Sequence, residues 1–327
     1  MRLNIRQKII SLFLFALFLT VFGCQISDPK AATIRSIPID LTLERFDEKF
    51  HLASPENIPA LKSEYPFLFP EKFHDSVWIR RQKDSLQQLL LDNVQARFTT
   101  TRPIEEDLEF LFKHLKYYFP KTQTPRAIGV INNVDYQSKT VYADSLLIIS
   151  LDTYLGVDHP LYEGIPRYVR QEMDIKFLSS HVAEKFAEKK IPLPKDRTFL
   201  SQMIYYGKMI YLKDWVLPDL SDAVKMRFSA SQILWAKENE KYIWQYFVEK
   251  QLLFSTDQNL SQRFIEPAPF SKFYLEIDNE SPGRIGVWMG WQIIKSYMAN
   301  HADTPIQTLL NLPAQTLFTK SNYKPDR

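Results

Sequence analysis

The sequence contains a single cysteine, Cys24, so no disulfide bond can form within one copy of the chain. A protein of 327 residues must then be held together by the packing of its side chains. The composition allows this, because 45% of the residues are hydrophobic and 24% are charged, which is an ordinary balance for a globular protein. We therefore expect a large hydrophobic core without covalent cross-links.

The residues that precede Cys24 have the order of a secretory signal peptide. The basic segment "MRLNIRQK" is followed by an apolar stretch from Ile9 to Phe22, which is of signal-peptide length. The stretch leads into "VFGC", which resembles the lipobox of bacterial lipoproteins. In that motif the chain is cut before a cysteine, whose thiol then receives a diacylglyceryl group.

We expect residues 1–23 to be a lipoprotein signal peptide and residues 24–33 to be a short tether, with Cys24 as the lipid attachment site. The membrane is then a partner of the chain through its lipid anchor. The alternative is an uncleaved signal anchor, because the run from Ile9 to Ile26 approaches the length of a membrane span.

Without residues 1–23, the chain carries no formal net charge. That segment holds Arg2, Arg6 and Lys8 and no acid, so 38 basic and 38 acidic side chains remain. Binding to nucleic acid depends on a basic surplus or a basic stripe that meets the phosphates. We therefore expect no nucleic acid among the partners.

Hydrophobic periodicity predicts one mainly helical α+β domain over residues 34–327. "SIPIDLTLERF" alternates as a strand does, and two or three further strands are expected between residues 126 and 156. Residues 84–98 and 103–118 are expected to be helices. The second half is expected to be helical at residues 160–172, 176–190, 197–213, 230–254, 282–300 and 304–311. The fold class is thus a small sheet in the first half followed by a helical second half.

No motif of a known enzyme class settles the function, because H-E-x-x-H, G-x-S-x-G, a P-loop and G-x-G-x-x-G are all missing from the sequence. The most metal-like spacing is that of His181, Glu184 and Glu188, which fall within about a 60° arc of a helix. One imidazole and two carboxylates suit zinc or another divalent ion. The alternative is that these residues form the solvent-exposed flank of an amphipathic helix.

The helix expected at 197–213 contains a glycine, Gly207, and Asp196 is expected to be its N-cap. A glycine inside a helix costs about 1 kcal/mol relative to alanine, so it usually marks a close neighbour. Tyr205, Tyr206 and Tyr211 form either the wall of a pocket or ordinary helix packing.

The segment "EIDNESPGR" allows two interpretations. Glu276, Asp278 and Glu280 could supply oxygens to calcium, although their order is not that of a calcium-binding loop. A helix start explains more of the segment, with Ser281 as the N-cap and Pro282 as the first helical residue.

The helix that follows carries Gly286 and Gly290 on one face, where another backbone can approach closely, and Trp288 and Trp291 flank this face. Arg284 is not explained by packing, because a cation in the first turn of a helix opposes the helix dipole. We place it in a candidate pocket whose residues are His181, Glu184, Tyr206 and Arg284.

Several long stretches resemble the gliding-motility lipoprotein GldB family of Bacteroidetes. They include "PIDLTLERFDEKF", "LKYYFPKTQTPRAI", "PKDRTFLSQMIYYGKMIYLKD" and "PAPFSKFYLEIDNESPGRIGVWMGWQIIKSYM", in order along nearly the whole chain after Cys24. The resemblance implies a lipid-anchored envelope protein required for gliding, a process linked in this phylum to type IX protein secretion. It implies partners in that machinery, but no catalytic residue and no cofactor can be carried over.

A more distant resemblance connects the helices at 176–190 and 197–213 with a class of zinc peptidases. Those enzymes carry H-E-x-x-H on the first helix and an acid-glycine pair on the second, whereas here the corresponding segments read "SSHVAEKFA" and Tyr206-Gly207. The resemblance implies a degenerate zincin-like architecture without peptidase chemistry.

Three functions remain open at this point. The first is a non-enzymatic component of motility or secretion complexes, anchored in the cell envelope and facing the periplasm, since no dense acidic run follows Cys24. The second is a metal-dependent envelope hydrolase with a divergent site at His181, Glu184 and Glu188. The third is a peptide- or lipid-binding module that uses the aromatic residues of 205–254.

Overall fold

A computed structural model describes residues 29–276 and 278–325. The chain divides into two compact units, residues 1–38 and 39–327. The described part of the first unit contains helix α2 (Pro29–Ser36). The predicted signal peptide and the lipid attachment site at Cys24 lie outside the described residues. Within the described ranges, no helix is both long and apolar enough to cross a bilayer.

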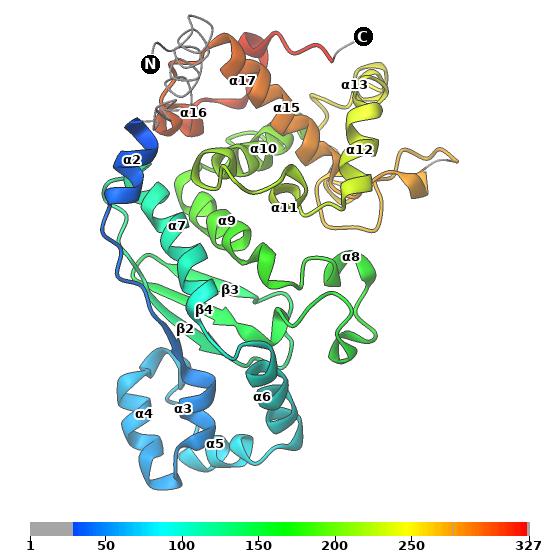
Figure 1. Cartoon of the computed structure of the whole chain (residues 1–327). Coiled ribbons are helices and arrows are strands. Elements are labelled where there is room, and N and C mark those ends of the chain that lie inside the picture. Colours follow the sequence, from blue (N-terminus) through cyan, green and yellow to red (C-terminus); the bar gives the residue numbers. More distant parts are fainter. Residues whose placement is uncertain (1–28, 277, 326–327) are drawn as a thin grey trace, which may run out of the picture. The chain divides into compact units, whose positions relative to one another are not determined.

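The second unit is built on one small mixed sheet (Figure 1). Its strands are β1 (Leu43–Arg45), β2 (Arg126–Val130), β3 (Thr140–Ala143) and β4 (Leu146–Ser150), in the order β1-β2-β4-β3. The first three strands in this order are parallel, and β3 pairs with β4 in the antiparallel direction. Parallel neighbours need a long crossover connection, which the helices between β1 and β2 provide.

Both faces of the sheet are covered, because successive residues of a strand point to opposite sides. Ile128 and Val130 pack into a core with α3 (Phe46–Leu52), α4 (Ile58–Glu64) and α5 (Asp75–Gln82). Ala127, Leu147 and Ile149 belong to the larger core on the other side. That side is covered by α6 (Ser85–Arg97), α7 (Arg102–Tyr118) and α9 (Leu178–Lys190) (Figure 1).

The rest of the larger core is formed around two long helices, α10 (Phe199–Val216) and α15 (Ile285–Asn300). A Cβ atom added to Gly290 would lie 1.8 Å from the Met203 carbonyl oxygen, and one added to Gly207 would lie 2.4 Å from the Gly290 carbonyl carbon. The two backbones therefore touch where these glycines cross. This confirms the close approach that Gly207 and Gly290 predict.

Shorter helices complete the second half. They are α8 (Arg167–Arg170), α11 (Asp222–Met226), α12 (Ala230–Glu238), α13 (Glu240–Glu249), α14 (Asn259–Phe264), α16 (Ile306–Asn311) and α17 (Ala314–Ser321). The predicted fold class, mainly helical with a small sheet in the first half, is confirmed.

Three predicted elements are wrong in extent. The helix expected at 160–172 is only a 3₁₀ turn and the short α8, because Gly164 has a φ of 83° and Pro166 stands before α8. The helix expected at 230–254 divides at Asn239 into α12 and α13. The strand expected in "SIPIDLTLERF" has only the three residues of β1.

Two predicted helix caps are also wrong. Thr198, and not Asp196, is the N-cap of α10, while the Asp196 carboxylate accepts hydrogen bonds from the Thr198 hydroxyl and the Ser201 hydroxyl. The helix expected at 282–300, α15, begins at Ile285, so Ser281 does not cap it and Pro282 is not its first residue.

Helix α15 begins at Ile285 because a serine from an earlier loop, Ser271, caps it there. The first N–H of α15, on Ile285, donates to the Ser271 hydroxyl oxygen at 3.2 Å. The Ser281 hydroxyl lies 2.7 Å from the Asp278 carbonyl oxygen and 3.0 Å from that of Ser271. The helix end is thus satisfied by a serine distant in sequence, which a local capping rule cannot detect.

Candidate functional site

A group of buried and largely buried charged side chains lies where α9 packs against α10 and the turn after α11. We call it the ion cluster, and its members are Lys139, Glu172, His181, Glu184, Lys213, Arg227 and Arg284. They come from both halves of the chain: Lys139 immediately precedes β3, Glu172 precedes α9, Lys213 is on α10, and Arg284 stands at the start of α15.

Glu184 is held by two cations. Its carboxylate accepts from Lys213 Nζ at 2.8 Å and from Arg227 Nη2 at 3.1 Å. Burial alone would raise the pKa of Glu184, but the charges of Arg227 and Lys213 hold this pKa well below its usual value. Glu184 is therefore an ionised carboxylate whose oxygens are both engaged.

Glu172 has a similar environment. Its oxygens lie 3.1 Å from Lys139 Nζ, 3.2 Å from Arg227 Nε and 3.3 Å from His181 Nε2. Burial opposes ionisation here too, yet the Arg227 charge and the His181 hydrogen bond hold the pKa of Glu172 well below its usual value. Arg227 thus bridges both carboxylates of the cluster.

The hydrogen bonds of His181 assign its proton. A carboxylate only accepts, so Nε2 carries the hydrogen that points to Glu172. The other nitrogen, Nδ1, accepts from the Tyr154 hydroxyl at 2.9 Å. Burial raises the pKa of Tyr154 and lowers the pKa of His181, so the phenol stays protonated and the ring stays neutral. Both ring nitrogens are therefore occupied.

The structure separates the three residues that suggested a metal site. His181 is only 6% exposed and Glu184 is 14% exposed at its side chain, so the interpretation as a solvent-exposed flank is wrong for both. Glu188 is on the surface, where it pairs with Lys185 at 2.9 Å. Across the part of the chain that the structure describes, no three His, Cys, Asp or Glu side chains are grouped so as to hold a metal ion.

Arg284 is buried beside the cluster, with 8% of its surface exposed. Its Nη1 donates to the Met226 carbonyl oxygen at 3.3 Å. Burial, together with the nearby charge of Arg227, lowers the pKa of Arg284 to about 10. Both arginines have left-handed backbones, with φ of 63° at Arg284 and 61° at Arg227, a conformation that non-glycine residues adopt only when the surroundings impose it.

Of the candidate pocket residues, the structure thus brings His181, Glu184 and Arg284 together. Tyr206 is half-buried on α10, and burial raises the pKa of its hydroxyl, but within the described residues it makes no hydrogen bond to the cluster. The sequence did not point to the other four members of the cluster, which are Lys139, Glu172, Lys213 and Arg227. Lys213 had a usable signal, because a lysine within an apolar helix needs a buried partner.

The structure gives Asp278, one of the three residues considered as calcium ligands, a different role. The Asp278 carboxylate accepts the backbone N–H groups of Phe273, Tyr274 and Leu275 at 3.0, 2.8 and 3.3 Å. Glu276 and Glu280 are exposed. Asp278 therefore stabilises the turn that precedes α15.

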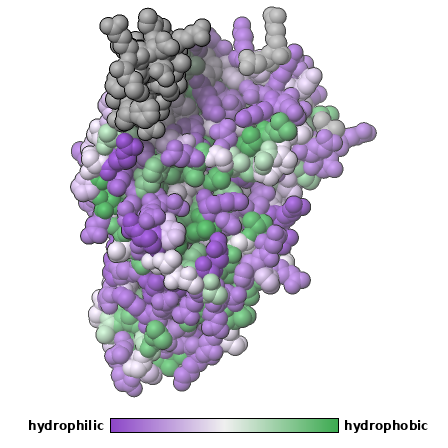
Figure 2. Space-filling view, in the orientation of Figure 1, coloured by the Kyte–Doolittle hydropathy of each residue, from purple (hydrophilic) through white to green (hydrophobic). Residues whose placement is uncertain are grey.

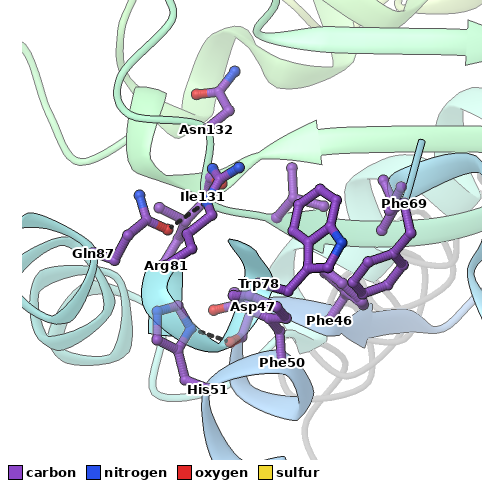
Figure 3. Close-up of a pocket in the computed structure, with 12 residues that line it drawn as sticks. Phe46, Asp47, Phe50, His51, Phe69, Trp78, Arg81, Gln87, Ile131 and Asn132 are labelled. Carbon is purple, nitrogen blue, oxygen red and sulfur yellow. Dashed lines mark hydrogen bonds between the residues drawn. The ribbon is translucent and has the colours of Figure 1, made fainter. Parts of the chain in front are cut away.

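A cavity of about 190 Å³ lies beside the carboxyl end of β2 (Figure 3). We call it the aromatic pocket, since Phe46, Phe50, Phe69 and Trp78 form its apolar walls. Its polar lining residues are Asp47, His51, Arg81, Gln87 and Asn132. Clefts at the carboxyl ends of parallel strands are common ligand sites. This one was not predicted, because the sequence pattern did not identify the strands as parallel.

Two polar atoms of the aromatic pocket residues have no hydrogen-bond partner in the described chain. His51 Nδ1 lies 2.8 Å from the Asp47 carbonyl oxygen and must donate to it, which leaves Nε2 as a buried acceptor (Figure 3). Trp78 Nε1 is a buried donor. Asp47 itself is satisfied, because Arg45 Nη2 pairs with its carboxylate at 2.7 Å. Buried polar atoms without partners are uncommon in folded proteins.

The face of the molecule in Figure 2 is mainly hydrophilic, with its hydrophobic residues in small separate groups. The exposed large hydrophobic residues of the second half include Leu234, Tyr242, Phe254, Tyr274 and Leu275.

Comparison with known proteins adds one finding. A family model described as gliding motility protein GldB matches residues 27–325. No curated protein and no solved structure matches the chain. Because the match extends over both halves of the fold, including the ion cluster and the aromatic pocket, the chain belongs to the gliding motility lipoprotein family GldB.

Proposed function

We propose that this chain is a lipid-anchored, non-catalytic component of the cell envelope that supports gliding motility by binding other components of the motility or type IX secretion machinery. The family match over residues 27–325 supports the role in motility. The expected lipid anchor at Cys24 supports the envelope location, and the lack of a dense acidic run after Cys24 favours the periplasmic side.

The main support for a non-catalytic role is that the nitrogens of His181 and the oxygens of Glu184 already have partners within the ion cluster. A metal ligand or a general base needs a lone pair directed at an ion or a substrate. Both nitrogens of His181 are engaged, and Glu184 is bound by two cations. These side chains hold α9, α10 and the turn after α11 together, which is a structural use of charge.

Replacing His181 in cells tests this proposal against a metal-dependent hydrolase. Under the proposal, a His181→Ala strain still glides when the protein is present at its normal level, because the surface of the fold is unchanged. His301→Ala is the matched control, since His301 lies at the end of α15 and hydrogen-bonds the Tyr297 carbonyl oxygen at 3.0 Å. Loss of gliding in the His181 variant alone, at a normal protein level and with cooperative unfolding, would favour the hydrolase.

A peptide- or lipid-binding module is the second candidate, and the aromatic pocket favours it. The pocket is lined mainly by aromatic and aliphatic side chains and holds a buried acceptor and a buried donor. Mass spectrometry of the chain purified in detergent tests it. A co-purifying ligand that a Phe50→Trp variant, which fills the pocket, no longer retains would support this function.

A further inference from the structure

The charges of the ion cluster do not balance. It contains four cations, Lys139, Lys213, Arg227 and Arg284, but only two carboxylates. His181 contributes no charge, because burial lowers the pKa of its ring and keeps the ring neutral. Burying an uncompensated charge is costly, because the interior solvates an ion poorly. The surplus therefore favours the binding of an anion beside the cluster.

The surplus is localised at Arg284. Lys213, Arg227 and Lys139 each pair with Glu172 or Glu184, whereas no carboxylate of the described residues lies within ion-pair distance of Arg284. Only 8% of its surface is exposed, and its one side-chain hydrogen bond within the described residues goes to a carbonyl oxygen, that of Met226, so the guanidinium has no anionic partner there.

A small cavity adjoins this side chain. Arg227, Arg284, Gln171, Gln232 and Gly283 are among its lining residues. Its volume of about 30 Å³ accommodates about two water-sized groups, which matches the two oxygens of one carboxylate. Glu172 also reaches this cavity, but Lys139 and Arg227 already match its charge.

The donors around the cavity suit an oxyanion. A guanidinium presents paired N–H groups that fit the two oxygens of a carboxylate. Gln232 uses its amide oxygen to accept the Ser229 N–H at the start of α12, so its NH₂ group is the part that remains for a ligand. The cavity is also next to the N-terminus of the sixteen-residue helix α15, where the helix dipole favours negative charge.

We propose that the cavity at Arg284 is a binding site for one carboxylate group, which Arg284 holds through its paired N–H donors. The carboxylate belongs either to a small free acid or to the end of a peptide chain, since both present the same group. This site is separate from the motility role, because it follows from charge and geometry whatever complex the chain joins.

The test is the melting temperature, Tm, of the full chain in detergent, measured in sodium acetate, sodium chloride or acetamide, with the two salts at equal ionic strength. Acetamide has the shape of acetate without its charge. We expect acetate, at ten times its dissociation constant, to raise the Tm by about 3 °C over chloride, and acetamide to leave it unchanged.

Variants assign this shift to the cavity. Arg284→Met should abolish it. Arg263→Met is the matched control and should keep it, because Arg263 also donates to a carbonyl oxygen, that of Lys272 at 2.8 Å, but lies outside the cluster. If Arg284→Met does not fold, Arg284→Lys serves instead, and it should at least halve the shift, since a lysine keeps the charge but loses the paired donors.

Acetylated diglycine, as its free acid and as its amide, distinguishes the two sources. A shift with the free acid alone identifies a chain end as a ligand, and a shift with acetate but with neither peptide identifies a small acid. Both results support the site. An acetate shift no larger than that of chloride, or one that is equal in wild type and in the Arg284 variant, overturns the proposal.

Discussion

The ion cluster and the aromatic pocket are two buried polar regions that differ in what they lack. In the ion cluster each carboxylate is bound by cations, and what remains is the positive charge of Arg284. In the aromatic pocket the carboxylate of Asp47 is paired, and what remains are the neutral atoms His51 Nε2 and Trp78 Nε1. The first region therefore needs a charge, whereas the second needs only a neutral hydrogen-bonding group on an apolar ligand.

The largest loss of stability should come from Glu184→Gln in the ion cluster. This variant leaves Lys213 and Arg227 buried with one fewer negative charge, which should cost about 3–5 kcal/mol in the free energy of unfolding. Glu188→Gln is the matched control on the same helix and should change it by less than about 1 kcal/mol, because that side chain is 40% exposed. Urea unfolding of the two variants measures both. Equal effects would show that the ion cluster does not stabilise the fold.

A pair of tryptophan variants compares a satisfied N–H with an unsatisfied one. Trp291 Nε1 donates to the Asp214 carboxylate at 2.7 Å, so Trp291→Phe should cost about 2–3 kcal/mol by leaving a partly buried carboxylate short of a donor. Trp78→Phe removes an N–H that has no partner, so it should cost about 1 kcal/mol, from lost packing. The same unfolding experiment checks this order, and the reverse order would mean that Trp78 Nε1 has a partner.

Acid should reduce the contribution of the ion cluster to the stability of the folded chain. The pKa of Glu184 is lower in the folded chain than its usual value near 4.5, so its stabilisation is present above about pH 4.5 and is lost as the pH falls towards the folded pKa. The difference in the free energy of unfolding between wild type and Glu184→Gln should therefore become smaller below pH 4.5. Unfolding curves at pH 7, 4.5 and 3 follow this difference, and a constant difference would contradict an ionised Glu184.

Some elements of this structure could be predicted from the sequence because they depend on local patterns. The helices α6 and α7 follow from hydrophobic periodicity within one segment. The contact of α10 with α15 follows from Gly207 and Gly290, since a glycine within a helix implies a close neighbour.

The two sites were harder to predict from the sequence because they are assembled from segments far apart in the chain. Arg227 comes from a turn in the left-handed conformation, and its two carboxylate partners come from another segment. The start of α15 depends on Ser271, ten residues away from the serine that local capping rules favour. The aromatic pocket depends on a parallel pairing through β1, whose three residues give almost no pattern.

The metal content of the purified full chain tests most directly the claim that the ion cluster is structural. The chain is isolated without chelators, and zinc is measured by atomic emission in the wild type and in His181→Ala. We expect far less than one zinc per chain in both, because His181 and Glu184 are already bound to other side chains. One zinc per wild-type chain that is lost with His181→Ala would contradict it.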